Sequence, residues 1–276
     1  MSSTAAHAAA PARPVRSHAL RDAATMLRRN LKRARRYPSL TATTVIMPVV
    51  MLLLFVYVFG GALGTGIAPV AGSGEAVRYV DYIAPGILLM AVTSGAIATA
   101  VAVAVDMTEG TVNRFRTMAI SRASVLTGHV VGSLVQTAIG LVAVLGAALA
   151  CGFRPNATVV EWAAALGVLM LLAFALTWVS AAMGLVAKTV ESASNAPMPL
   201  TFLPFMGSSI VPPESMPGAL RWFAEYQPFT PVNETLRGLL MGTPIGSSGP
   251  LALAWSAVLA LAGYLWARRK ARRAQR

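Results

Sequence analysis

Tyr82–Val105 reads YIAPGILLMAVTSGAIATAVAVAV, 24 consecutive residues without a single Asp, Glu, Lys or Arg. An α-helix of about 20 apolar residues is long enough to cross the hydrocarbon core of a bilayer. Five further stretches lack charged residues over a comparable length, namely 37–74, 123–153, 162–187, 192–213 and 238–267. A buried helix of a soluble domain would be shorter and would carry a polar stripe. These stretches therefore predict an integral membrane protein.

The composition agrees with this prediction. Hydrophobic residues make up 56% of the 276-residue chain, charged residues make up 12%, and the mean hydropathy is +0.63. Soluble domains carry about twice that share of charged residues, so a soluble fold is excluded. We predict an all-α membrane fold with six transmembrane helices, at about 41–62, 83–106, 125–150, 160–187, 194–211 and 249–267. Kinks are expected in the fifth, which is interrupted by Pro197, Pro199 and Pro204.

The basic residues predict how these helices are oriented. A net charge of +13 could suggest a nucleic acid partner, but its distribution along the chain indicates a membrane instead. With six spans, nineteen Lys and Arg residues fall on the side of the two termini and four fall on the other side. Loops rich in Lys and Arg stay in the cytoplasm. We therefore expect a multi-pass protein with both termini cytoplasmic.

The sequence before the first span divides into two parts. Residues 1–17 are rich in Ala, Ser and Pro and are expected to form a disordered tail. Residues 18–36 place apolar side chains at helical spacing among basic ones, which favours an interface helix on the cytoplasmic leaflet. Its principal residues are Leu20, Leu27, Arg28 and Leu31. A topology anchor held only by anionic lipid is the alternative, and a second basic tail, 268–276, follows the last span.

The few charged residues near the predicted spans lie at their borders. Asp106, Glu161 and Lys188 occupy span ends, and no charged residue is central. Ion-coupled transporters usually place ionisable groups within their spans, so the driving energy is expected to come from elsewhere. The chain contains no G-x-x-x-x-G-K-[ST] phosphate loop and no Cys/His spacing typical of a metal site. We predict no catalytic residue and no cofactor or metal bound by this chain, and we interpret His129 as a packed or capping residue.

One cytoplasmic segment has amphipathic character. Residues 107–120 place Val112, Phe115 and Ala119 on one face of a possible short helix, with Arg114 and Arg116 beside it. Such a helix could dock in the groove of a partner. A simple basic loop is the alternative.

The segment 212–248, on the opposite side, is too polar to be a span and too apolar to be a free loop. We predict two short helices in it, near 214–226 and 231–241. In the second helix Glu234 and Arg237 are three residues apart and are expected to approach each other.

Three groups of short motifs occur in order along the chain. The first opens the second span, the second lies in the cytoplasmic segment and the third begins the segment on the opposite side. They are Tyr82-Ile83-Ala84-Pro85-Gly86, then Glu109-Gly110-Thr111 with Arg114-Phe115-Arg116 and Ser121-Arg122, then Val211-Pro212-Pro213-Glu214-Ser215-Met216-Pro217 with Pro228-Phe229-Thr230-Pro231 and Leu236-Arg237-Gly238-Leu239-Leu240. With these motifs and six spans, the chain resembles the ABC-2 family of exporter permeases, particularly its daunorubicin/doxorubicin-resistance branch.

The resemblance implies an ABC-2 type transmembrane domain over residues 18–267, with six helices per subunit and two subunits around the transport path. Cytoplasmic ABC ATPase subunits would supply the energy and would bind ATP and Mg²⁺, so this chain would not itself be an enzyme. The second permease subunit could be another copy of this chain or a different one. The expected location is the bacterial plasma membrane, with membrane lipids and no nucleic acid as further partners.

The resemblance also implies site residues. Residues 107–120 would form a coupling helix that enters the ATPase cleft, with contacts from Glu109, Gly110, Arg114, Phe115, Arg116 and Arg122. The family often has proline where this chain has Ala119, so the helix could continue further here. The outer helices within 214–241 would cap the exit, with Pro213, Glu234 and Arg237 as an outer gate.

The substrate is predicted only by class. The spans offer apolar and small polar groups, among them Met90, Thr93 and Met206, that suit hydrophobic drugs or other amphiphiles. Methionines fit lipid-facing packing equally well. Export of lipid-linked glycans or lipids is the alternative within the family. A non-transporting membrane scaffold and an ion-coupled secondary transporter are the alternatives from other classes.

Overall fold

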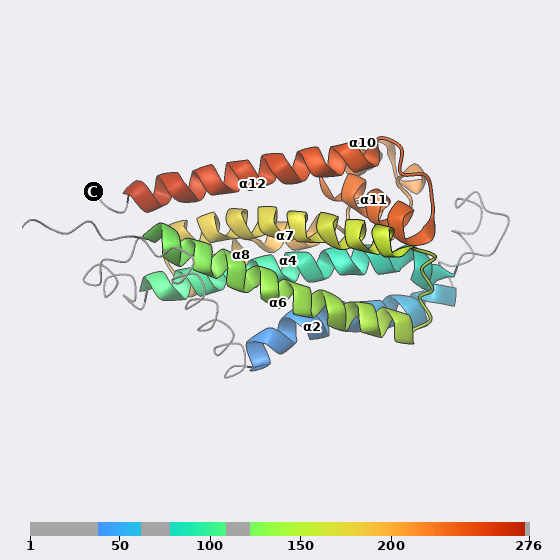
Figure 1. Cartoon of the computed structure of the whole chain (residues 1–276), viewed down its shortest axis with the longest axis horizontal. Coiled ribbons are helices and arrows are strands. Elements are labelled where there is room, and N and C mark those ends of the chain that lie inside the picture. The colour runs from blue at the N-terminus through green and yellow to red at the C-terminus, as the bar shows by residue number, and fades with distance from the viewer. Residues whose placement is uncertain (1–37, 62–77, 109–121, 274–276) are drawn as a thin grey trace, which may run out of the picture.

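The computed structural model describes residues 38–61, 78–108 and 122–273, and this part of the chain is helical, with no strand (Figure 1). The predicted all-helical class is therefore confirmed for these residues. In chain order the elements are α2 (Pro38–Leu53), the π-helical η1 (Leu54–Phe59), α4 (Tyr79–Thr108), α6 (Arg122–Ala150), α7 (Val159–Val186), α8 (Val190–Asn195), α9 (Met198–Phe202), the 3₁₀ turn η2 (Pro213–Ser215), α10 (Gly218–Tyr226), α11 (Phe229–Met241) and α12 (Ser248–Arg273).

Four helices of the described residues are long and apolar enough to cross a membrane, namely α4, α6, α7 and α12. They correspond to the second, third, fourth and sixth predicted spans. A shorter apolar helix, Val45–Phe59, runs from α2 into η1 within the first predicted span. Helices therefore occupy these regions as the charge-free stretches predict.

The long helices give the molecule two distinct ends. α7 and α12 run parallel to each other, and α4 and α6 run antiparallel (Figure 1). At one end α4, α7 and α12 terminate and α6 begins. This end, termed the basic end, carries Lys188, Arg268, Arg269 and Lys270. The opposite end, at which α4, α7 and α12 begin, is termed the junction end.

α4 is the central helix of the bundle. It contacts α2, α6, α7, α8, α9 and α11, and most of its side chains are buried. Glycines allow the neighbouring backbones to come close: a Cβ on Gly184 of α7 would lie 2.5 Å from the Ala100 carbonyl oxygen of α4, and one on Gly263 of α12 would lie 2.6 Å from the Val179 nitrogen of α7. Close backbone approach through small residues is the usual basis of helix association in membranes.

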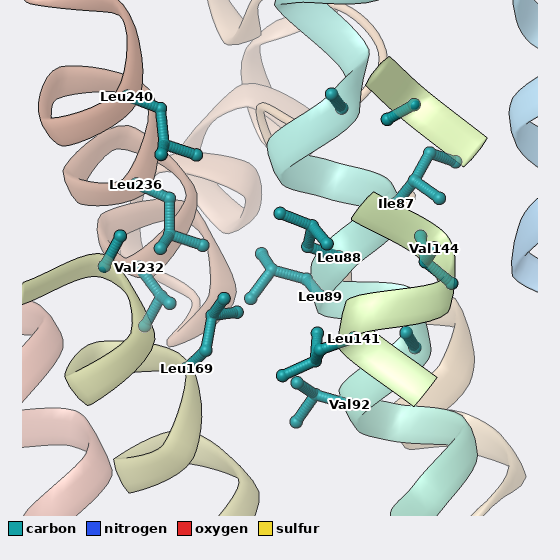
Figure 2. Packing of buried hydrophobic residues seen from close by; sticks show 14 of the residues in the cluster. Ile87, Leu88, Leu89, Val92, Leu141, Val144, Leu169, Val232, Leu236 and Leu240 are labelled. Carbon is teal, nitrogen blue, oxygen red and sulfur yellow. The ribbon is translucent and has the colours of Figure 1, made fainter. Parts of the chain in front are cut away.

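An apolar cluster joins α4 to α6, α7 and α11 towards the junction end (Figure 2). α11 inserts three fully buried side chains, Val232, Leu236 and Leu240, into this cluster. They lie at i, i+4 and i+8 on one face of the helix. α11 is thus packed into the bundle and is not a loosely attached surface helix. Its last turn ends at Gly242, which adopts a left-handed conformation with φ 74°.

The fifth predicted span is a broken segment. Instead of one helix, residues 190–210 form α8, α9 and a series of turns. The segment leaves α7 at the basic end, and its later part lies against Tyr82 of α4. The end of α7 packs against α4 at Ala100, through Gly184. Tyr82 is 18 residues before Ala100, about 27 Å along α4, so the broken segment leads from the basic end towards the junction end. The expected proline interruption is present, because α9 begins directly after Pro197 and ends just before Pro204.

The predicted outer helices near 214–226 and 231–241 are observed as α10 and α11, both at the junction end (Figure 1). The interface helix predicted at 18–36, with Leu20, Leu27, Arg28 and Leu31, lies outside the described residues. The predicted coupling segment lies mostly outside them too: only Met107 and Thr108 are described, and they continue α4.

Candidate functional site

Arg237 is the centre of a polar cluster at the junction end. Its Nη1 donates to Glu234 Oε1 at 2.8 Å, and its Nη2 donates to the carbonyls of Ser208 at 2.9 Å and Tyr82 at 3.3 Å. The guanidinium carbon lies 4.0 Å from the centre of the Tyr82 ring, within cation–π range. The Arg237 side chain is only 12% exposed. One side chain of α11 thus bonds α4 and the broken segment simultaneously. We term Arg237, Glu234, Tyr82, Ser208 and Asn233 the junction.

The Ser208 carbonyl is the acceptor on which these hydrogen bonds converge. Besides Arg237, it receives the Tyr82 hydroxyl at 3.2 Å and Asn233 Nδ2 at 3.0 Å. In a continuous helix this carbonyl would accept the backbone N–H four residues later, but that residue is Pro212, which has no N–H. Because a buried carbonyl without a partner is costly, side chains of α4 and α11 take the place of the missing donor.

A second carbonyl of the broken segment is bonded in the same way. Gln227 Nε2 donates to the Leu203 carbonyl at 2.9 Å. Thr230 Oγ1 donates to the Ala224 carbonyl at 2.5 Å and accepts the Ser208 backbone N–H at 3.4 Å. The link between α10 and α11 therefore contacts the broken segment as well.

Gly86 lets the broken segment lie directly on α4. A Cβ at this position would come within 2.6 Å of Ser209 Cβ and 3.0 Å of the Ser209 carbonyl oxygen. Any side chain larger than hydrogen would push residues 208–209 away from α4, and with them the Ser208 carbonyl. The glycine of the Tyr82–Gly86 motif thus has a packing role at the junction.

A second polar contact ties the α6–α7 connection to the start of α4. The buried carboxylate of Asp81 accepts Arg78 Nε at 3.1 Å and the Arg154 backbone N–H at 3.0 Å. This arrangement fixes the first turn of α4, which carries Tyr82.

A third buried polar contact lies towards the basic end. His129 Nε2 of α6 lies 2.8 Å from Asp106 Oδ2 of α4, and the two side chains are 7% and 4% exposed. Val103, Leu126 and Val130, which are near the pair in sequence, belong to a buried apolar cluster formed by α4, α6, α7 and α12. His129 is therefore a packed residue, as predicted, but its ionisable partner 23 positions away was not anticipated.

The polar groups of the junction hold neighbouring elements together. The junction's carboxylate and guanidinium are paired, and the Tyr82 hydroxyl and the Asn233 amide donate to the Ser208 carbonyl. Asn233 Oδ1 and Arg237 Nε are buried without a hydrogen-bond partner among the described residues. Such groups hold elements in register, and a change in their pairing would release one element from another. The junction thus connects the start of α4 and α11, which both carry sequence motifs, to the broken segment.

Comparison with known proteins decides the family. Residues 21–241, most of the chain, match the family model of the ABC-2 type transporter. The chain belongs to the ABC-2 type transporter family.

Relatives of this permease include proteins named for drug resistance. It is 30% identical to the daunorubicin resistance ABC transporter permease protein of Streptomyces coeruleorubidus over 232 residues, which cover 84% of this chain and 79% of the relative. It is 24% identical to a probable doxorubicin resistance ABC transporter permease protein of Mycobacterium tuberculosis over 214 residues, covering 78% and 76%. The resemblance drawn from the three motifs is therefore confirmed.

The predicted site residues of the permease are placed as follows. Glu234 and Arg237 form the expected ion pair, and Pro213 is buried in η2. Met90 and Thr93 are buried in α4, where the Thr93 hydroxyl donates to the Met90 carbonyl, and Met206 is 41% exposed in the turns after α9. The described part of the chain contains the backbone of Arg122 at the start of α6. Glu109, Gly110, Arg114, Phe115 and Arg116 lie outside it.

Several junction residues were not predicted as site residues, chiefly Tyr82 and Asn233. Tyr82 was noted only as part of the motif that opens the second span. Pro212 was the available signal for the Ser208 carbonyl, since a proline leaves the carbonyl four residues earlier without its helical donor. The Asp106–His129 contact has no such local signal, because it depends on the relative position of two helices.

Proposed function

We propose that this permease is the membrane subunit of an ATP-driven exporter that moves hydrophobic drugs or similar amphiphiles out of the cell. The observation that supports this most directly is the 30% identity to a daunorubicin resistance permease across 84% of the chain. The absence of charged residues from the middle of the predicted spans favours an external energy source over ion coupling.

The proposed orientation has the basic end in the cytoplasm and the junction end outside. The cations at the basic end support it, since Lys and Arg stay on the cytoplasmic side. In this orientation α2 with η1, α4, α6, α7, the broken segment and α12 make six crossings, and both chain termini are cytoplasmic. The chain would then be a multi-pass protein of the bacterial plasma membrane.

Energy would enter through the segment between α4 and α6. Both helices have their ends at the basic end, so the intervening residues 109–121 are tethered there in sequence. We assign the ATPase contacts to Glu109, Gly110, Arg114, Phe115, Arg116 and Arg122, with help from the interface helix at 18–36. The ATPase subunits would bind ATP and Mg²⁺, and two permease subunits would enclose the path.

The junction would act as the outer gate. Closure of the ATPase would shift α4, and the bonds of Tyr82 to Ser208 and Arg237 would transmit this shift to the broken segment and α11. An export cycle needs two states of the exit that the ATPase state biases differently, and a polar joint with exchangeable partners provides them. The proposed path residues are Met206, which is exposed, and Met90 and Thr93, which are buried in this structure.

The first experiment is co-purification with a candidate ABC ATPase from detergent. Wild type is compared with a variant carrying Arg114→Glu and Arg116→Glu, with Arg221→Glu on α10 as the control at the opposite end. We expect a stable, ATP-hydrolysing complex for wild type and for the control, and its loss in the double variant. If wild type binds no ATPase, the exporter proposal is wrong; if all three bind equally, the contact lies in another segment.

A second experiment tests the substrate class. Cells or proteoliposomes containing the permease and its ATPase are loaded with daunorubicin, and its ATP-dependent efflux is followed by fluorescence. Efflux above the ATPase-only level supports drug export. ATP turnover stimulated by a lipid-linked glycan or a lipid, but not by the drug, would favour the alternative substrates. Turnover that never responds to the permease would favour a scaffold.

A further inference from the structure

The helices α4 and α6 are joined at three successive levels, by two polar contacts and one close packing contact. Nearest the basic end is the pair of Asp106 and His129, separated by 2.8 Å. Next is the hydrogen bond from Thr99 Oγ1 to Ser133 Oγ at 2.8 Å. The third is Gly95, which leaves room for the Thr137 hydroxyl. The two antiparallel helices are thus held side by side over much of their length.

The Asp106–His129 pair differs from the other two contacts because it lies at the helix ends and because burying it costs desolvation free energy. Asp106 lies two residues before the end of α4 at Thr108, and His129 lies two turns after the start of α6. Both side chains are almost completely buried. Burying two ionisable groups costs desolvation energy, so such a pair often contributes less stability than apolar residues of the same size. Its position indicates a role other than stability.

That position is at the two helix ends that the segment 109–121 connects. A force applied to this connection would fray an untied helix end, because terminal turns lack part of their backbone hydrogen bonds. With the ends tied to each other, the force moves both helices as one body. At its other end the same helix carries Tyr82, which bonds Ser208 and lies under Arg237. α4 therefore connects the basic end to the junction.

We propose that the Asp106–His129 pair is a positioning device that clamps the ends of α4 and α6, so that ATPase movements reach the junction instead of unwinding these ends. This inference rests on the proposed function. It assigns neither residue to the substrate or to ATP; both act through the rigidity of the helix pair. The clamp is needed for coupling between ATP hydrolysis and efflux, and it is not needed for folding or for binding of the ATPase.

The test compares apolar and polar replacements of the pair in the full complex. The variant Asp106→Leu with His129→Leu removes both ionisable groups but fills the space. We expect normal amounts in the membrane, normal co-purification of the ATPase and continued ATP hydrolysis, with daunorubicin efflux per ATP reduced about tenfold. The control is Thr99→Val with Ser133→Ala, which removes a polar contact between the same helices away from their ends and should leave this ratio close to wild type.

The exchange variant, Asp106→His with His129→Asp, rebuilds the pair in the opposite direction and is expected to restore the efflux ratio. If the Leu variant pumps with the wild-type ratio, the clamp is overturned. If the Leu variant fails to accumulate, efflux per ATP is measured instead for the single substitution His129→Gln and for the exchange variant. An exchange variant that folds but stays uncoupled overturns the proposal. Failure of wild type itself to pump would contradict the proposed function and not the clamp.

Discussion

The guanidinium of Arg237 bonds two backbone carbonyls and one carboxylate while lying over an aromatic ring. A planar group with five donors in fixed directions suits this task, whereas a lysine ammonium offers a single point of charge. The sequence predicted the part of this arrangement that is local, the pairing with Glu234 three residues earlier. The hydrogen bonds to Ser208 and Tyr82, 29 and 155 positions away, could not be predicted because they depend on how three elements pack.

Replacing Arg237 should destabilise the permease, because this one side chain holds α4, α11 and the broken segment together. For Arg237→Leu we expect the free energy of unfolding to fall by about 2–4 kcal/mol, since charge-assisted hydrogen bonds and a cation–π interaction disappear together. Arg237→Lys should cost about half as much, because one donor remains near the carbonyls. Thermal unfolding in detergent measures both. Arg221→Leu, which breaks an exposed ion pair with Glu225, is the control and should change little; equal Tm values for all variants would contradict the junction.

Gly86→Ala tests the close approach of the broken segment to α4. The added methyl group would meet Ser209, so we expect the free energy of unfolding to fall by about 1–3 kcal/mol, with a lower Tm. Gly146→Ala in α6 is the matched control, because a Cβ there meets nothing within 4 Å. Replacing a helical glycine that faces open space with alanine stabilises the helix by up to about 1 kcal/mol. A Tm for Gly86→Ala as high as that of Gly146→Ala would show that the segment does not rest on this glycine.

At the scale of elements, the long helices were predictable and the broken one only in part. Charge-free stretches of sufficient length locate α4, α6, α7 and α12, because the spacing of charges reflects the apolar environment directly. For residues 190–210 the prolines indicate where helix formation stops. They do not indicate that the freed carbonyls are bonded by side chains of α4, α11 and the α10–α11 link, since that depends on distant residues. The pairing of Asp106 with His129 was missed for the same reason.

α10 presents its aromatic residues away from the bundle. Trp222 is 65% exposed and Tyr226 is 63% exposed, while Ala224 on the other side is buried. Because Trp and Tyr favour the headgroup region, we expect Trp222 to lie at the outer membrane–water interface. In a variant whose other tryptophans, Trp162, Trp178, Trp255 and Trp266, are replaced by Phe, lipids brominated near the headgroup should quench its fluorescence more than lipids brominated deep in the chain. Quenching by neither kind of lipid would place α10 against protein or water.

For the molecule as a whole, the proposed orientation places the two ends in opposite compartments. In a background with the single cysteine removed, Cys151→Ser, new cysteines are introduced at exposed positions: Asn156→Cys at the junction end and Arg269→Cys at the basic end. A membrane-impermeant maleimide should label position 156 in intact cells and position 269 only after permeabilisation. The reverse pattern would invert the proposed orientation. Labelling of both from outside would contradict a bundle that spans the membrane with these ends on opposite sides.

The contact between α7 and α12 also bears on how the molecule is made. A Cβ on Gly263 of α12 would lie 2.6 Å from the Val179 nitrogen of α7, so the two backbones are in close contact. Next to this position, the rings of Trp178 and Tyr264 pack edge to face. These two parallel helices are separated in sequence by the whole broken segment, α10 and α11. A ribosome therefore releases α7 into the membrane well before its partner exists. Until the final helix is inserted, the permease remains in the bilayer as an open intermediate, and a premature stop codon even at the last span would leave it for membrane proteases.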